Sequence, residues 1–454
     1  MTIDITLRHG TANIPIGTIE EVEEGETVFT FSRSYIELGP DRPLLSLRWF
    51  DVKGEEKTLG RMFKRGDKIG RRGVLPAWFS GLLPEGALRK LVDRELGPGR
   101  HSETLVLSRL GGDLPGAVAA SGGGRMHRHE YPEPDRRARR IQYSLAGVQM
   151  KFGAKLDKDR VTFPALGLGG DYIAKTTSET LPILVEAEYV GMQLSSLVGV
   201  DTAPTSLVPR EQVDGVPEEF LRHGEYVFLS RRFDRIGSTR VHIEDFAQIA
   251  DALGDQKYFF GNYESCLNTI SRFSASRDAD IGQGFRRMVN DILIGNADAH
   301  LKNWSFVHGE GGPRLSPAYD IVPSGAWGDT DLGIKLAGRK SMEAIGLATL
   351  QRIGRFLEVP EEEIRRLVSE TIDMAYDAWP RADLGTETQD RVRKALVARL
   401  DRLQLVREFR PTASMSRAQP VVDDTDARAR ASTDAGTEDD PRSDEGPEPG
   451  PKFP

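Results

Sequence analysis

The sequence has a single cysteine, Cys266, among 454 residues, which excludes an internal disulfide bond and gives no sign of an oxidising compartment. It has no run of about 20 apolar residues, the length that spans a membrane. Its first residues lack the basic segment and apolar stretch of a secretory signal. The formal net charge is −8, so no chain-wide positive charge points to nucleic acid or to an acidic membrane surface. We therefore expect a cytoplasmic protein without a membrane partner.

The composition changes along the chain and predicts four parts. Residues 411–454 consist of Pro, Ser, Thr, Asp, Glu, Ala and scattered Arg, so they cannot bury enough apolar surface to fold and are predicted to be a disordered acidic tail. Residues 1–125 are predicted to be a β-rich subdomain, residues 126–235 to alternate strands with one helix, and residues 236–410 to be helical. A strand-rich first half and a helical second half indicate an α+β protein with two lobes.

Local patterns place several elements within these parts. Approximate alternation predicts strands at residues 28–35 and 45–50, and Pro84 suits the first turn of a helix. Apolar residues at Phe285, Met288 and Ile292 share one helix face, which Gly295 ends. Helices are also predicted after Pro360 and over residues 391–405.

Three polar residues follow the helix that ends at Gly295. Asp298 and Asn303 stand five residues apart in a polar loop, and a predicted β-hairpin then leads to Asp320. Phosphoryl transfer needs a carboxylate near the attacking hydroxyl and oxygen ligands that hold Mg²⁺ on the phosphates. Protein kinases arrange a base Asp, an Asn five residues later and a second Asp after a hairpin in this order. The spacing alone is not decisive, because Asp and Asn also cap helices and turns in ordinary polar loops.

Upstream segments supply the other parts of a nucleotide site. Lys175 lies in a short strand-like run, and Glu188 lies on the apolar face of the helix that follows, where a carboxylate requires a cation. We therefore predict a Lys175–Glu188 ion pair. Small residues in the segment 143–153 allow backbone N–H groups to approach phosphates, and residues 225–235 fit a hinge between lobes. No Walker A motif occurs, which argues against a P-loop NTPase.

Taken together, these segments resemble the HipA family, the kinase toxins of bacterial toxin–antitoxin modules, over most of residues 40–400. The resemblance is carried by residues 82–89 (LLPEGALR), 110–117 (LGGDLPGA), 144–151 (SLAGVQMK), 185–189 (VEAEY), 232–235 (RFDR), 296–303 (NADAHLKN), 317–320 (PAYD) and 333–338 (GIKLAG). It implies a two-lobed protein-kinase-like fold with a β-rich N-lobe, an extra N-terminal subdomain and an all-helical C-lobe.

The resemblance also implies a serine/threonine kinase that uses ATP and Mg²⁺. Asp298 would be the catalytic base, Asn303 and Asp320 the metal ligands, and Ser144 a site of autophosphorylation that silences the enzyme. The predicted nucleotide-binding residues are Ala146, Gly147, Val148, Gln149, Lys151, Lys175, Glu188, His300 and Lys302. Val148 and Met150 depart from the usual Ala and Glu of the family's loop, whereas Ser144, Gly147, Gln149 and Lys151 match it. His300 has two readings, a residue that orients the catalytic loop or a surface histidine.

In the family, the partner is a small helix-turn-helix antitoxin, and the kinase reaches operator DNA only through it. Known substrates include aminoacyl-tRNA synthetases, so the implied outcome is growth arrest through blocked translation. Two other functions stay open. A small-molecule phosphotransferase uses the same Asp, Asn and Asp chemistry, and a non-catalytic co-repressor scaffold would keep the fold without needing those residues.

Overall fold

A computed structural model describes residues 1–22, 26–39, 42–49, 68–72, 74–97, 101–122, 151–157, 160–162, 170–177, 183–215 and 220–410. The predicted acidic tail and the predicted phosphate-loop positions Ser144, Ala146, Gly147, Val148 and Gln149 lie outside these residues. Within the described part of the chain, no helix combines the length and the apolar character needed to cross a membrane.

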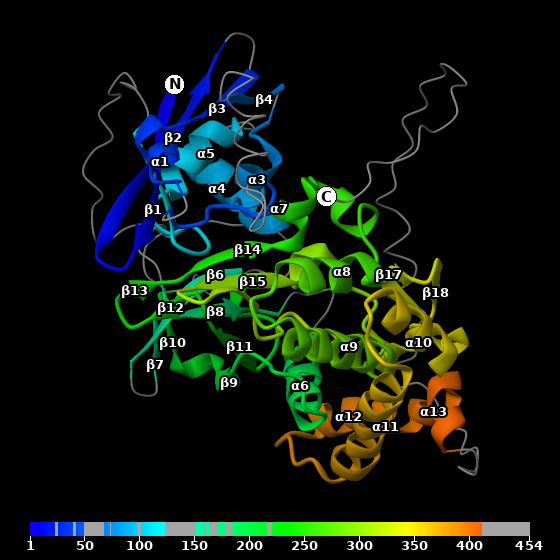
Figure 1. Cartoon of the computed structure of the whole chain (residues 1–454). Coiled ribbons are helices and arrows are strands. Elements are labelled where there is room, and N and C mark those ends of the chain that lie inside the picture. Colours follow the sequence, from blue (N-terminus) through cyan, green and yellow to red (C-terminus); the bar gives the residue numbers. More distant parts are fainter. Residues whose placement is uncertain are drawn as a thin grey trace, which may run out of the picture.

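The first part, the N-terminal subdomain, is an antiparallel sheet accompanied by helices (Figure 1). The strand order is β4-β3-β2-β1-β5. Its aromatic core includes Phe29, which stacks on Trp49, and Trp78, which meets Phe79 edge to face. The elements are β1 (Thr2–His9), β2 (Ala12–Glu21), β3 (Glu26–Phe31), α1 (Arg33–Glu37), β4 (Lys68–Arg72), α3 (Ala77–Ser80), α4 (Gly86–Leu96), α5 (Glu103–Leu110) and β5 (Val118–Ser121).

The second part, the N-lobe, is a sheet of order β10-β7-β6-β8-β11-β9 with one long helix, α6 (Leu184–Leu197). Helix α6 packs against β9 and β11 and buries Val185, Glu188 and Met192 on one face. The strands are β6 (Lys151–Asp157), β7 (Arg160–Thr162), β8 (Tyr172–Lys175), β9 (Thr205–Pro209), β10 (Val213–Asp214) and β11 (Tyr226–Arg231).

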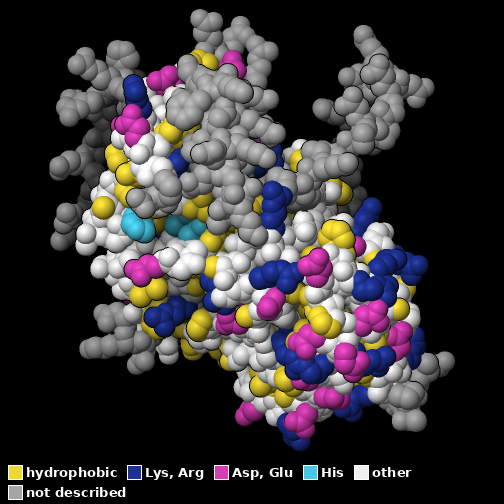
Figure 2. All heavy atoms as spheres, in the orientation of Figure 1, with side chains coloured by type: hydrophobic (Ala, Val, Ile, Leu, Met, Phe, Trp, Pro, Cys, Tyr) yellow, Lys and Arg dark blue, Asp and Glu magenta, His cyan; other side chains and the backbone are white. Residues whose placement is uncertain are grey.

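The third part, the C-lobe, is built around α9 (Arg277–Ile294), which packs against α8 (Tyr263–Phe273), α11 (Glu361–Ala378) and α12 (Glu387–Arg399) (Figure 1). Gly295 ends α9 in the left-handed conformation at φ 75°, as a C-terminal glycine does. Figure 2 shows charged side chains of both signs mixed over this lobe, the pattern of a solvated surface. Its other helices are α7 (Phe246–Ala250), α10 (Leu347–Phe356) and α13 (Gln404–Phe409), with the 3-10 turns η5 (Gly254–Tyr258) and η6 (Leu301–Asn303) near the site.

The C-lobe also carries strands. These are the hairpin β12 (Arg235–Ile236) and β13 (Thr239–Arg240), the sheet of β14 (His242–Asp245), β15 (Ser305–Gly309) and β16 (Gly312–Leu315), and the hairpin β17 (Asp331–Leu336) and β18 (Arg339–Ser341). The α+β, two-lobed fold is confirmed, and so is the hairpin before Asp320, but the expectation of an all-helical C-lobe is corrected. Strand β14 was not predicted, because the residues on its buried face, His242 and Glu244, are polar and so show no alternation of hydrophobic residues.

The predicted strand at residues 45–50 is wrong. Leu45, Leu47 and Trp49 are buried, but Ser46 is buried too, so burial does not alternate as it does in a strand. Side chains, not a neighbouring strand, are the hydrogen-bond partners of this backbone. The Leu45 N–H donates to the Tyr35 hydroxyl at 3.2 Å, and the Leu47 N–H donates to Glu244 at 2.9 Å. Tyr35 itself, predicted as the end of a strand, lies in α1.

Glu244 joins the N-terminal subdomain to the C-lobe. Its fully buried carboxylate accepts from the Leu47 N–H, from the Ser46 hydroxyl and, at 2.7 Å, from the indole N–H of Trp78. A buried carboxylate is stable only when donors surround it in this way. The subdomain is thereby fixed against the lobe that carries Asp298.

Candidate active site

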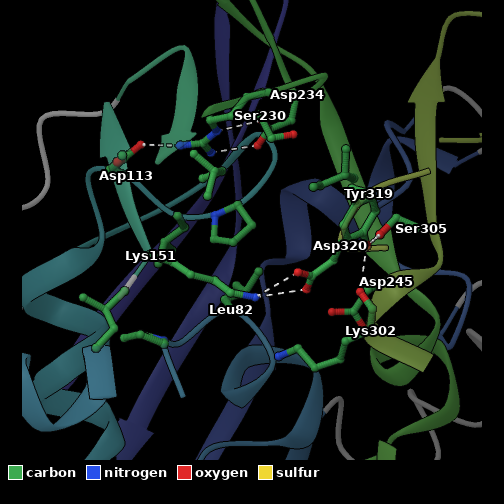
Figure 3. A pocket seen from close by; sticks show the side chains of 18 of the residues that line it. Leu82, Asp113, Lys151, Ser230, Asp234, Asp245, Lys302, Ser305, Tyr319 and Asp320 are labelled. Carbon is green, nitrogen blue, oxygen red and sulfur yellow. Dashed lines mark hydrogen bonds and ion pairs between the residues drawn. The ribbon is translucent and has the colours of Figure 1, made fainter. Parts of the chain in front are cut away.

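A cavity of about 460 Å³ lies where the three parts meet (Figure 3). The N-lobe contributes Lys151 and Lys175, and the C-lobe contributes Lys302 and Asp320. The N-terminal subdomain contributes an apolar wall that includes Leu82, Leu83, Leu88, Val92, Leu110 and Leu114. The cavity therefore combines lysines and a carboxylate at the junction of the lobes with an apolar wall from the subdomain, and further charged residues, Asp113, Arg232 and Asp234, line it as well. Such a lining suits a molecule with an anionic part and an aromatic part.

The predicted pair of Lys175 and Glu188 is present and almost fully buried. The Lys175 ammonium bonds Glu188 from α6 and Asp320 from the C-lobe. Burial works to lower the pKa of Lys175, but the two carboxylates outweigh it and raise that pKa. Lys175 is therefore a permanent positive charge at the junction of the two lobes.

The Asp320 carboxylate bonds several of the polar groups at the junction of the lobes. Lys151 approaches it at 3.0 Å (Figure 3). The side-chain amide of Asn303 donates to it at 3.2 Å. Burial works to raise the pKa of Asp320, but Lys151 and Lys175 hold it well below its usual range. Asp320 also adopts the left-handed backbone conformation at φ 60°, which Asp tolerates better than most residues other than glycine.

The segment from Asn296 to Asn303 forms a stiff loop after α9. The Asp298 N–H donates to the Asn296 side chain at 3.2 Å, and the His300 N–H donates to the Asn303 side chain at 2.9 Å. Asn296 in turn donates to Asp291 at 3.0 Å. The Asp298 carboxylate is exposed and accepts from the Tyr258 hydroxyl at 2.8 Å.

The sequence-predicted residues separate into three groups. Lys151, Lys175, Glu188, Asn303 and Asp320 come together in one hydrogen-bonded cluster. Lys302 lines the same cavity, whereas Asp298 and His300 lie beside it on the same loop. His300 is buried, with its ring edge to face on Tyr258 at 4.9 Å, which decides against a surface histidine. The loop positions between Ser144 and Gln149 lie outside the described residues.

Sequence reasoning missed three residues of the site. Tyr258 bonds Asp298, Glu85 bonds Lys302 at 2.9 Å, and Asp245 lines the cavity beside Lys302. Burial raises the pKa of Asp245 to about 6 despite the opposing charge of Lys302. Glu85 lies within the segment 82–89 that carries the family resemblance, which assigned it no role, and no motif marks Tyr258 or Asp245.

The residues present fit a magnesium ion that is held mainly by phosphates. Among the described residues, no group of three or more His, Cys, Asp and Glu could hold a metal alone. Magnesium needs fewer protein ligands, since one or two carboxylates together with phosphate oxygens and waters complete its shell. Asp320 offers its carboxylate oxygens, and the Asn303 side-chain amide lies beside them with its nitrogen toward Asp320 and its oxygen on the His300 N–H. Lys151 and Lys175, which bond the same carboxylate, would meet the phosphates.

Comparisons with known proteins place these features in a family. Residues 143–379 match the HipA-like C-terminal domain, and residues 10–121 match the HipA N-terminal domain. The "Putative kinase Y4dM" of Sinorhizobium fredii is 33% identical over 405 residues, which cover 87% of this chain and 96% of that protein. The "Serine/threonine-protein kinase toxin HipA" of Shewanella oneidensis is 25% identical over 309 residues, 60% of this chain and 68% of that protein.

A solved structure shows the same fold. It is the complex of Shewanella oneidensis HipA with HipB and its operator DNA. Its HipA matches with a TM-score of 0.66 at 18% identity, over 91% of this chain and 100% of that one.

Proposed function

This chain belongs to the HipA family of kinases, and we propose that it transfers the γ-phosphate of ATP to a serine or threonine hydroxyl of another protein. One observation carries this proposal. Two ammonium groups and an amide from both lobes meet on the single carboxylate of Asp320, inside a cavity with an apolar wall. Phosphoryl transfer is catalysed mainly by positioning and by charge stabilisation, and this cluster provides both.

Each residue of the cluster has a role in the proposed reaction. Asp320 and Asn303 would hold Mg²⁺, which neutralises charge on the phosphates when it is bound. Lys175, fixed by Glu188, and Lys151 would meet the phosphates themselves. The hinge residues Ser230 to Phe233 and the leucines of the N-terminal subdomain line the end of the cavity that suits an adenine.

Asp298 is the proposed base. Its carboxylate is exposed beside the cavity, so a hydroxyl on a large partner can reach it, and the Tyr258 hydroxyl fixes its orientation. A base must lie within hydrogen-bond reach of the proton that it removes. An exposed carboxylate on a stiff loop meets this condition for a protein substrate.

Our proposal for the biological role is based on a relative whose name states its role. We propose that the chain is the toxin of a toxin–antitoxin pair, that its substrate belongs to the translation machinery, and that autophosphorylation of Ser144 limits its activity. The Shewanella oneidensis relative is named a kinase toxin, and its structural complex contains HipB and operator DNA. We further propose a small helix-turn-helix antitoxin as partner, through which this chain would reach DNA.

The test is a transfer assay with mass spectrometry. Purified protein is incubated with Mg²⁺ and ATP beside the Asp298→Asn variant, which keeps the shape of the side chain and removes its basicity. We expect phosphate on Ser144 in the wild type and a rate at least ~100-fold lower in the variant, the usual size of general base catalysis. Calorimetry should give similar ATP affinity for both proteins.

The other outcomes are informative. No phosphate and no ATP binding would replace the kinase by a non-catalytic scaffold. ATP binding without transfer would point to a small-molecule acceptor, provided that the starting mass shows no phosphate already present. In a second comparison, Ser144→Ala should stay active longer than the wild type, and an unchanged time course would exclude self-limitation at that residue.

A further inference from the structure

Glu85, from the N-terminal subdomain, is bonded to two lysines of the C-lobe. It directly precedes α4, and its two carboxylate oxygens accept from different lysines, Lys302 at 2.9 Å and Lys257 at 2.8 Å. The carbonyl of Gly81, from the same segment, accepts from Lys302 at 3.1 Å. The subdomain therefore contacts the C-lobe at two points beside the proposed base.

The first contact leads to the metal-binding residues. Lys302 directly precedes Asn303, and its own carbonyl accepts from the Tyr319 hydroxyl at 2.7 Å. Tyr319 directly precedes Asp320. The Lys302 side chain is thus held by Glu85, while its backbone is joined to Asn303 through the chain and to the residue before Asp320 through a hydrogen bond.

The second contact leads to the base. The Lys257 ammonium lies 5.4 Å from the centre of the Tyr258 ring, and the Tyr258 hydroxyl donates to Asp298 at 2.8 Å. The same ring packs edge to face against His300 at 4.9 Å. The bond from Lys257 to Glu85 therefore helps to fix the Tyr258 ring, whose hydroxyl orients the Asp298 carboxylate.

We propose that Glu85 is a positioning residue for the catalytic loop, acting on the base Asp298 through Lys257 and Tyr258 and on the metal ligands through Lys302. The inference rests on the kinase activity proposed above. Burial works to raise the pKa of Glu85, but Lys302 and Lys257 lower it to about 2, so the carboxylate stays ionised at neutral pH.

The proposed role predicts an effect on rate rather than on folding. The Glu85 side chain is 43% exposed, whereas Lys257 and Lys302 are 16% and 22% exposed. Glu85→Gln keeps an oxygen that can accept from these lysines, and Lys302 keeps the Gly81 carbonyl, so the cost in stability should be small. A displacement of a reacting group by about 1 Å can cost up to ~100-fold in rate. Loss of the Glu85 charge should therefore lower kcat by about tenfold, with little change in the affinity for ATP or in Tm.

The experiment compares Glu85→Gln with Glu37→Gln under saturating Mg²⁺ and ATP. Glu37 forms an exposed ion pair with Arg33 in the same subdomain, so its variant loses one ion pair far from the site. We expect a kcat about tenfold lower for Glu85→Gln only, with the calorimetric Kd for ATP within about twofold of the wild type in both variants. Glu85→Asp should recover part of the loss.

Coupling to Tyr258 completes the test. Tyr258→Phe should lower kcat by itself, and the double variant with Glu85→Gln should lose less than the product of the two single losses, since only the part of the Glu85 effect that passes through Lys302 remains when the Tyr258 hydroxyl is absent. Equal kcat for wild type and Glu85→Gln would overturn the inference and leave the kinase proposal intact. Additive losses would also overturn it, and an inactive wild type would overturn the kinase proposal first.

Discussion

Lys175→Met should destabilise the protein, and a second substitution should restore stability without restoring activity. The lysine ammonium bonds two carboxylates, and removing it affects them differently. Glu188 is 1% exposed and would be left without a cation. Asp320 would keep Lys151 and Asn303. The cost therefore falls on Glu188.

The expected magnitude follows from that difference. Removing one partner of a buried ion pair costs about 3–5 kcal/mol, whereas replacing both by apolar residues is often neutral. Lys175→Met should lower Tm by about 6–20 °C, at the ~2–4 °C per kcal/mol that applies to folding units of about 150–250 residues. Lys175→Met with Glu188→Leu should recover most of that loss, since the Phe228 ring already lies 5.6 Å from the lysine.

The assay is thermal unfolding together with phosphate transfer. Lys151→Met is the matched control, because it removes the other lysine from Asp320 at a side chain that is 46% exposed, and it should change stability by less than about 1 kcal/mol. Both variants at position 175 should lack transfer activity. A double variant as unstable as Lys175→Met would refute the reasoning, since the loss would then not come from an unpaired buried charge.

Three further predictions concern other parts of the site. Gly333→Ala should lower transfer activity at least ~10-fold. The added Cβ would lie 2.3 Å from a backbone oxygen of the catalytic loop, so the loop would have to move. Gly309→Ala, which adds a Cβ in open space, should behave as wild type in the same assay. Asp245 has a pKa of about 6, above its ordinary 3.8, so the folded protein binds that proton more tightly than the unfolded chain and loses stability as pH rises from about 4 to 6. Asp245→Asn should therefore gain Tm relative to wild type between pH 5 and 7, and a constant difference would contradict the assignment. Trp78→Phe removes a donor from the buried Glu244 carboxylate and should cost about 1–3 kcal/mol in unfolding experiments, an effect absent if another donor replaces it.

The sequence predicted those parts of the site that depend on neighbours in the chain. The helix that ends at Gly295, the hairpin before Asp320 and the Lys175–Glu188 pair all follow from local periodicity or from a charge placed on an apolar face. Each of these signals spans fewer than 20 residues, so interactions between residues that are close in the chain determine the structure there.

The remaining parts depend on contacts between distant segments. Glu85 bonds a lysine 217 positions away, and no periodicity marks a residue that acts at that distance. Strand β14 was missed because the buried side chains of His242 and Glu244 are polar and are satisfied by partners from the N-terminal subdomain. In each case the tertiary partner determines the structure, and the partner is not visible in the local sequence.

The lone cysteine has a practical consequence for measuring motion. Cys266 is buried in α8, and burial raises the pKa of its thiol, so it is a poor target for thiol-reactive dyes in the folded protein. Cysteines introduced at exposed Glu37 and Glu362 would then carry the only accessible thiols of the described residues. Energy transfer between dyes at those positions would report the distance between the N-terminal subdomain and the C-lobe as nucleotide binds, in a protein that needs no other residue replaced.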